Sequence, residues 1–128
     1  MSRRDAREVA FKMVFEYSFN KNENTNILEE YTAEMVADDV AYVKEVYFGV
    51  TSHYDELMEK VSANAEKFSA DRLFKVDLAI LLLAIYEITY VSSIPFKVFV
   101  DEALNLAKKY STEKSAKYIN GVLAKFAR

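Results

Sequence analysis

The stretch Val76–Val91, VDLAILLLAIYEITYV, decides the fold of this chain. It is apolar at nearly every position, and its acidic residues are Asp77 near the start and Glu87 near the end. A helix that is apolar all round is covered by neighbouring helices on most of its sides. The stretch is also shorter than the roughly 20 residues that a membrane span needs. It therefore predicts the central, buried helix of a bundle.

The composition of the whole chain agrees with this prediction. A fold of many strands needs turn residues about every 8–12 positions, but the 128 residues include only two glycines and one proline. The 52% hydrophobic and 29% charged residues are typical of a soluble globular domain. We therefore expect one compact all-α domain over residues 1–128, with about six or seven helices and no membrane span.

Apolar residues recur at helical spacing on both sides of the central stretch. Ser2 is expected to cap a first helix, with Asp5 in the position of a capping box, and residues 20–26 read as a polar loop. Gly121 lies inside the last helix, where glycine costs roughly 1 kcal/mol, and a close helix crossing would explain it. The other elements are expected from Ile27 to about Ala37, from Val40 to about Ala65, in a short turn capped by Ser69 near Leu73, from Pro95 to about Tyr110, and after a cap at Ser111 or Thr112.

Charge is distributed unevenly along the chain, although the net charge is only −3. Residues 1–15 carry +2, residues 16–71 carry −9, residues 72–96 are neutral, and residues 97–128 carry +4. Basic ends around an acidic middle suggest two partners of opposite charge.

Catalytic chemistry is poorly represented. The absence of cysteine excludes disulfides, thiolate zinc sites and a cysteine nucleophile, and it suits a reducing cytosol. The single histidine, His53, has no second histidine to act with, and Gly49 and Gly121 form no phosphate-binding loop. Acidic pairs such as Glu29–Glu30 fit helix ends. We therefore expect no enzyme activity, no metal and no cofactor, and a cytoplasmic location.

One flank of the first helix joins basic and aromatic residues: Arg3, Arg4 and Arg7, followed by Phe11, Phe15 and Phe19. Two interpretations remain open at this point. The phenylalanines can fill a second buried contact, as often happens in a bundle. Alternatively, the flank is exposed, so that the arginines bind phosphates and the rings receive a base or a protein partner.

The last two helices carry a second basic group. Each lysine alone is typical of a solvated surface, but together with the N-terminal arginines they predict a patch suited to single-stranded nucleic acid. The group consists of Lys97, Lys108, Lys109, Lys114, Lys117 and Lys125, with Tyr118 beside Lys117.

Several runs of sequence, taken in order, resemble the NusB antitermination family. They are Arg3–Glu8, Val76–Glu87, Ile94–Val98, Glu102–Lys108, Ser111–Glu113 and Lys117–Leu123. The resemblance extends over essentially the whole chain, with a looser match at residues 20–70. It implies an all-α fold of about seven helices in two packed bundles, and a role without catalysis.

The resemblance also implies partners. Family members bind the boxA element of nascent ribosomal transcripts as single-stranded RNA. They do so as a heterodimer with the ribosomal protein NusE, and they join RNA polymerase and other Nus factors to suppress premature termination. The family's RNA contacts match Arg3, Arg4, Arg7 and Tyr118, to which the basic patch adds Lys97, Lys114 and Lys117; the positions used against NusE match Phe15, Phe19 and Asp77.

Two departures from the family pattern and two alternatives remain. Asp5 interrupts the arginine run, whereas Lys114 replaces a residue that is often acidic in relatives. The chain could instead be the NusB-like domain of an rRNA methyltransferase, which would need a further domain with a glycine-rich cofactor loop. It could also be a helical homodimer scaffold that binds no RNA, although self-association would not exclude the main hypothesis.

Overall fold

The computed structural model describes residues 2–65 and 73–127. Its regular structure over these residues is entirely helical, which confirms the all-α prediction. The expected turn capped by Ser69 lies outside the described residues. The helices are α1 (Arg3–Asn20), α2 (Thr25–Thr32), α3 (Ala37–Ser52), α4 (Tyr54–Asn64), α5 (Lys75–Tyr90), α6 (Phe96–Tyr110) and α7 (Glu113–Ala124).

Three of the described helices have a side-chain cap at their N-terminus. At α1, the Ser2 hydroxyl accepts a hydrogen bond from the Asp5 N–H at 3.2 Å, and the Asp5 carboxylate accepts one from the Ser2 N–H at 2.8 Å. This confirms the expected capping box, which satisfies two backbone donors at once. Thr112 caps α7, as expected, while Asn24 caps α2, so that this helix starts earlier than the sequence suggested.

The single long helix expected from Val40 to about Ala65 is instead two helices, α3 and α4, which meet at His53. The backbone of His53 leaves the helical region at φ −113° and ψ 22°, and its ring Nδ1 lies 2.9 Å from the Gly49 carbonyl oxygen. The same ring packs against Tyr90 of α5 at 4.5 Å between centroids. The helix therefore breaks where the His53 ring packs against α5. Neither glycine nor proline stands at this position to signal the break in the sequence.

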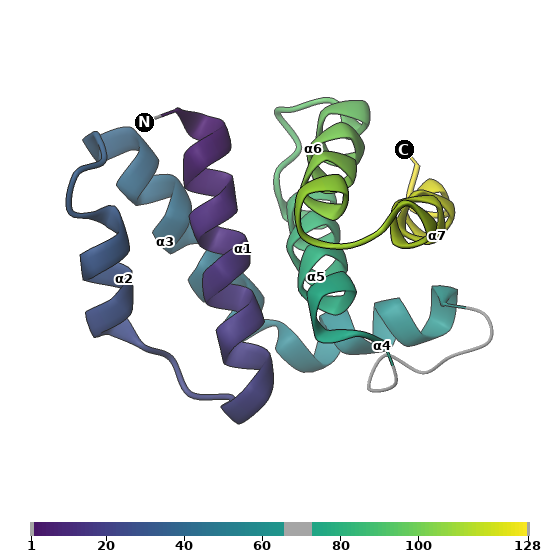
Figure 1. Ribbon diagram of the computed structural model, residues 1–128, viewed down its shortest axis with the longest axis horizontal. Coiled ribbons are helices and arrows are strands. Elements are labelled where there is room, and N and C mark those ends of the chain that lie inside the picture. Colours follow the sequence, from purple (N-terminus) through teal and green to yellow (C-terminus); the bar gives the residue numbers. More distant parts are fainter. Residues whose placement is uncertain (1, 66–72, 128) are drawn as a thin grey trace.

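Helix α5 forms the centre of the molecule, as its sequence predicts. Its residues from Asp77 to Ile88 are all buried, and it packs against α1, α3, α4, α6 and α7. Figure 1 shows α1, α2 and α3 on one side of the molecule and α4, α6 and α7 grouped with α5 on the other. This arrangement agrees with the expectation of two packed helical groups.

The close helix crossing is at Gly49 and not at Gly121. A Cβ atom built on Gly49 of α3 would lie 2.1 Å from Cζ of Tyr86 on α5, well inside van der Waals contact. Gly121 is exposed on α7, and apart from its chain neighbours and the backbone of its own helix, no atom of the described residues lies within 4 Å of a Cβ built there. The explanation that the sequence suggested for Gly121 is therefore wrong.

Candidate nucleic-acid and partner surfaces

Arg3 and Arg4 lie at the N-terminal end of α1, near the starts of α3 and α6 (Figure 1). The Arg3 Nε is 2.9 Å from Oδ1 of Asp39, and its guanidinium lies 4.5 Å from the centre of the Tyr42 ring. The Arg4 Nη2 is 3.2 Å from Oε1 of Glu102, but its side chain remains 68% exposed. Both cations are therefore on the surface, as predicted, and each already has an acidic partner.

Arg7 lies in the interior, unlike the other two arginines. Its side chain is only 8% exposed, and its guanidinium donates to both oxygens of Glu87 at 3.3 and 3.2 Å. The Tyr42 hydroxyl donates to the same carboxylate at 3.1 Å. Burial raises the pKa of Glu87. Burial lowers the pKa of Arg7, but its interactions with Glu87, Tyr42 and Glu102 together raise it by more. The exposed position that the sequence predicted for Arg7 is therefore corrected to an internal one, because α1 turns this residue toward α5.

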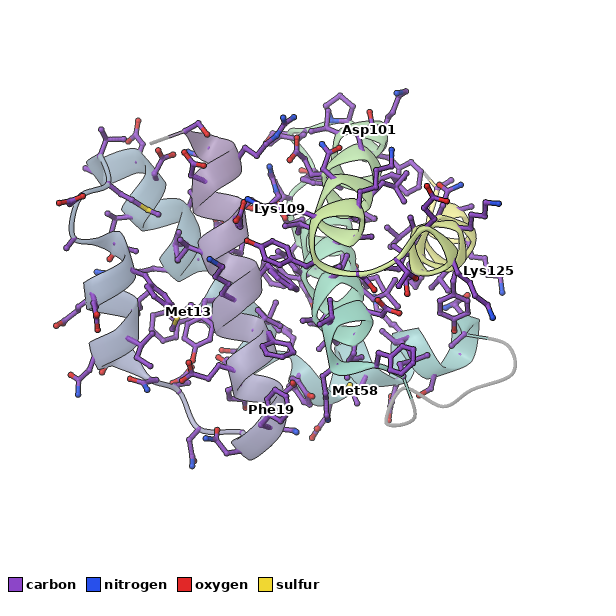
Figure 2. The ribbon with its side chains drawn as sticks, viewed as in Figure 1. Met13, Phe19, Met58, Asp101, Lys109 and Lys125 are labelled. Atoms are coloured by element: carbon purple, nitrogen blue, oxygen red, sulfur yellow. The ribbon has the colours of Figure 1, made fainter. Side chains whose placement is uncertain are left out.

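The aromatic row of α1 passes from the core to the surface. Phe11 is buried, Phe15 is half-buried, and Phe19 is 60% exposed. The rings of Phe15 and Phe19 meet edge to face at 5.0 Å. Both interpretations of this row thus apply, each to different members of it. Figure 2 places Phe19 at the lower end of α1, which is its C-terminal end.

Phe74 is an exposed aromatic that the sequence analysis missed. It is 78% exposed at the N-cap position of α5. The next residue, Lys75, reaches Phe19, with its Nζ 5.9 Å from the ring centre. An aromatic residue where polar capping residues are usual was the available signal. We refer to Phe15, Phe19 and Phe74 together as the aromatic end.

A cleft of about 340 Å³ separates the start of α5 from α7. Its lining brings together Lys114 and Tyr118, predicted to contact RNA, and Asp77, predicted to contact a protein. The lining residues are Leu73, Phe74, Asp77, Thr112, Lys114, Ser115 and Tyr118. Residues assigned separately to RNA and to protein thus share one site.

The carboxylate of Asp77 faces inward within this lining. Asp77 is buried, and it accepts hydrogen bonds from the hydroxyls of Ser111 and Ser115, each at 2.7 Å. These bonds tie the first turn of α5 to the junction between α6 and α7. The structure therefore shows that Asp77 holds the first turn of α5 against the α6–α7 junction, while its contact with a protein partner stays a prediction.

The predicted basic residues line several different grooves. Arg4 and Lys108 line a groove of about 440 Å³ along α6, and the exposed Lys97 at the start of α6 bonds Asp101 at 3.0 Å. We define Arg3, Arg4, Lys97 and Lys108 as the α1–α6 group, and Lys114, Lys117 and Lys125 as the α7 group. In Figure 2, Lys125 lies beside α7, on the side of the molecule away from α1.

The α7 group surrounds the half-buried Tyr118. Lys117, Lys125 and the exposed Gly121 line a small groove with Tyr118. The Tyr118 hydroxyl donates to the Ala65 carbonyl oxygen at 3.0 Å. This bond anchors the ring at the end of α4, in the groove that Lys117 and Lys125 also line.

Lys109 occupies a third environment, between α1 and α6 (Figure 2). Its Nζ bonds both oxygens of Glu8, at 2.8 and 3.0 Å, and the Tyr110 hydroxyl donates to the same carboxylate. Burial raises the pKa of Glu8, but Lys109, Tyr110 and Lys12 together lower it by more, so that the pKa lies below the ordinary value of 4.5. Lys109 is therefore used to hold α6 against α1.

The described residues include no group of three histidine or acidic side chains placed to hold a metal ion. None of the helices described over 2–65 and 73–127 is both long enough and apolar enough to cross a membrane. His53 contacts the Gly49 carbonyl and the rings of Tyr86 and Tyr90, so its visible role is in packing.

Over the described residues, the chain is a small domain of packed helices. The sequence model of the NusB family matches residues 4–128. The transcription antitermination protein NusB of Clostridium novyi is 40% identical over 127 residues, which cover 96% of each chain. The same protein of Finegoldia magna is 36% identical over 125 residues, which cover 96% of this chain and 91% of its own. The chain belongs to the NusB family.

Solved structures agree with this assignment. NusB of T. maritima is 33% identical with a TM-score of 0.91, and the match covers 99% of this chain and 91% of that one. A crystal structure of the antitermination factors NusB and NusE in complex with double-stranded RNA matches at 25% identity with a TM-score of 0.86. That match covers 97% of this chain and 94% of the other.

Proposed function

We propose that this chain is a transcription antitermination factor that binds boxA-type single-stranded RNA in nascent ribosomal transcripts as a heterodimer with NusE. The proposal rests on one observation: nearly the whole chain matches antitermination proteins and a structure that contains NusB, NusE and RNA. In this role the chain acts in the cytoplasm without catalysis, within an elongation complex of RNA polymerase and other Nus factors.

The exposed cations are assigned to the RNA. Arg3 and Arg4 extend from the start of α1 with Lys97 nearby on α6, while Lys114 and Lys117 lie on α7. Cations neutralise phosphates and provide affinity without sequence preference. An aromatic ring such as that of Tyr118 adds a surface on which an unpaired base can stack. The buried Arg7 contributes indirectly, because it holds α1 against α5.

The aromatic end is assigned to NusE. Interfaces between proteins are enriched in aromatic residues, and a few buried anchors provide much of their binding energy. Phe19 and Phe74 are among the most exposed large apolar residues of the described chain. Asp77 supports this surface from within by fixing the α6–α7 junction beside Phe74.

The RNA assignment is tested by fluorescence anisotropy with three labelled RNAs: a single-stranded boxA-like sequence, its scrambled version and a duplex. Each is measured with and without NusE at two salt concentrations. We expect NusE to increase the preference for the single-stranded boxA sequence. Equal binding to the boxA and scrambled RNAs with NusE present would contradict the proposal.

Variants localise the contact. Arg4→Ala is expected to weaken binding and to reduce the slope of log affinity against log salt by about 0.7, the change for one lost phosphate contact on a single strand. Lys44→Ala is the matched control, because Lys44 is an exposed cation on α3, outside both basic groups. Equal effects of the two substitutions would remove Arg4 from the site.

The partner assignment is tested by titrating NusE into chains carrying Phe19→Asp or Phe74→Asp. Both rings are exposed, so we expect loss of NusE binding while circular dichroism and the unfolding midpoint stay unchanged. Val36→Asp is the control, because Val36 is a large apolar residue that is 64% exposed elsewhere on the chain. Unchanged NusE affinity in both phenylalanine variants would refute the assignment.

Sedimentation of the same variants without NusE tests the homodimer hypothesis. If the unmodified chain self-associates and Phe19→Asp makes it monomeric, the aromatic end also serves as a dimer surface. NusE would then have to displace a second copy of the chain.

A further inference from the structure

We propose that Glu102 acts as an internal competitor for phosphate at Arg4, so that RNA binding requires Arg4 to exchange this carboxylate for a phosphate group. This inference rests on the RNA binding proposed above. It assigns to an acidic residue of α6 a role in setting the affinity of the basic surface.

The geometry identifies Arg4 as the partner that moves. Glu102 Oε1 is 3.2 Å from Arg4 Nη2, and Glu102 Oε2 is 3.7 Å from Arg7 Nη1. The Glu102 side chain is only 15% exposed, whereas that of Arg4 is 68% exposed. Arg4 can therefore turn outward into solvent while Glu102 stays beside the buried Arg7.

The charges around Glu102 direct its effect to Arg4. Arg7 already has a closer acidic partner in Glu87, which it contacts with two hydrogen bonds. Glu102 therefore supplies the neutralising charge for Arg4. A carboxylate and a phosphate present similar acceptor oxygens to a guanidinium group, so that both compete for the same N–H donors.

The surroundings of this pair suit an incoming phosphodiester chain. Arg4 and Glu102 line the groove along α6, together with Asn105 and Lys108. A phosphate in this groove would meet Lys108 as well as the released Arg4. Because the Glu102 carboxylate lines the same groove, its charge offsets that of Arg4 as long as the two side chains are paired.

Glu102→Gln removes the charge and keeps the shape of the side chain. We expect its affinity for boxA-like RNA to rise about two- to fivefold, the range corresponding to an exposed ion pair. The gain is expected to disappear when Arg4→Ala is added, because the carboxylate then has no exposed arginine to occupy. A gain that persists in the double variant would show that general repulsion, and not competition at Arg4, is responsible.

The experiment compares the unmodified chain, Glu102→Gln, Arg4→Ala and the double variant in the same anisotropy titration. Glu59→Gln is the matched control, because it removes an equal charge from an exposed position on α4. A gain in Glu102→Gln no greater than that in Glu59→Gln overturns the inference. An unmodified chain that binds no RNA overturns the proposed function itself, so the two failures are distinguishable.

Urea unfolding of each variant verifies that it is folded. If Glu102→Gln is destabilised through Arg7, Glu102→Asp replaces it, because aspartate keeps the charge and withdraws it from Arg4 by one methylene. A smaller gain in affinity in the same direction is then expected, and unchanged or weaker binding would overturn the inference.

Discussion

The two glycines of this chain provide a matched test of the packing. Both lie inside helices, Gly49 in α3 and Gly121 in α7. A methyl group at Gly49 would lie 2.1 to 2.4 Å from three atoms of the Tyr86 side chain. Tyr86 is 7% exposed, and its ring packs against those of His53 and Tyr90. The Tyr86 side chain or the helix backbone must therefore shift if Gly49 becomes alanine.

The expected energies follow from two effects. Replacing glycine by alanine inside a helix stabilises it by about 0.5–1 kcal/mol, and this gain applies to both positions. Crowding in a packed core costs about 1–3 kcal/mol, and it applies only at Gly49. Gly121→Ala is therefore expected to be stabilising by about 0.5–1 kcal/mol, and Gly49→Ala to be less stable than Gly121→Ala by about 1–3 kcal/mol.

Urea unfolding monitored by circular dichroism gives both values, and a double-mutant cycle tests the cause. Tyr86→Leu removes the atoms that a methyl group at Gly49 would meet, so Gly49→Ala should be better tolerated in that background. Equal stabilities of the two alanine variants would refute the reasoning. A penalty at Gly49 that is unchanged in Tyr86→Leu would show that Tyr86 is not its source.

Two further predictions concern charged contacts of α1. Arg7→Ala should lower the free energy of unfolding by about 3–5 kcal/mol in a urea titration, because it leaves the Glu87 carboxylate buried without its cation. Arg4→Ala should change it by less than about 1 kcal/mol, and equal effects would contradict the burial of Arg7. Glu8→Gln should be destabilising at neutral pH. The folded-state pKa of Glu8 lies below its ordinary value of 4.5. The stabilisation that ionised Glu8 provides is therefore fully present above pH 4.5, and it is lost as the pH falls through the folded-state pKa. Unfolding of both proteins from pH 7 to pH 3 should show their stabilities converging, and a constant difference would contradict this assignment.

Much of the fold could be predicted from local sequence pattern. The apolar run Val76–Val91 predicted the buried central helix, and the Ser2–Asp5 pair predicted the start of the first helix. The break at His53 was missed, because neither glycine nor proline stands there and the heptad-like apolar spacing continues across it. Phe74 was missed because its place at the N-cap of α5, where polar residues are usual, was not recognised in the sequence.

The sequence predicted which types of residue form the candidate site, but it predicted their positions in the fold only in part. Arg3 and Arg4 lie on the surface as expected. Arg7 differs because its partner Glu87 is 80 residues away in sequence, and only the packing of α1 on α5 brings the two together. The same holds for Asp77, whose carboxylate is enclosed by Ser111 and Ser115 of the α6–α7 junction.

Sequence alone determined that this chain is helical, where its central helix lies, and that its ends are basic. These properties depend on the spacing of apolar residues, on caps and on composition, which act within a few residues of one another. Only the tertiary structure decided that Arg7 is buried against Glu87 and that Lys109 pairs with Glu8 across α1 and α6. Burial and ion pairing depend on helices far apart in sequence, and their positions follow from the packing of the whole core.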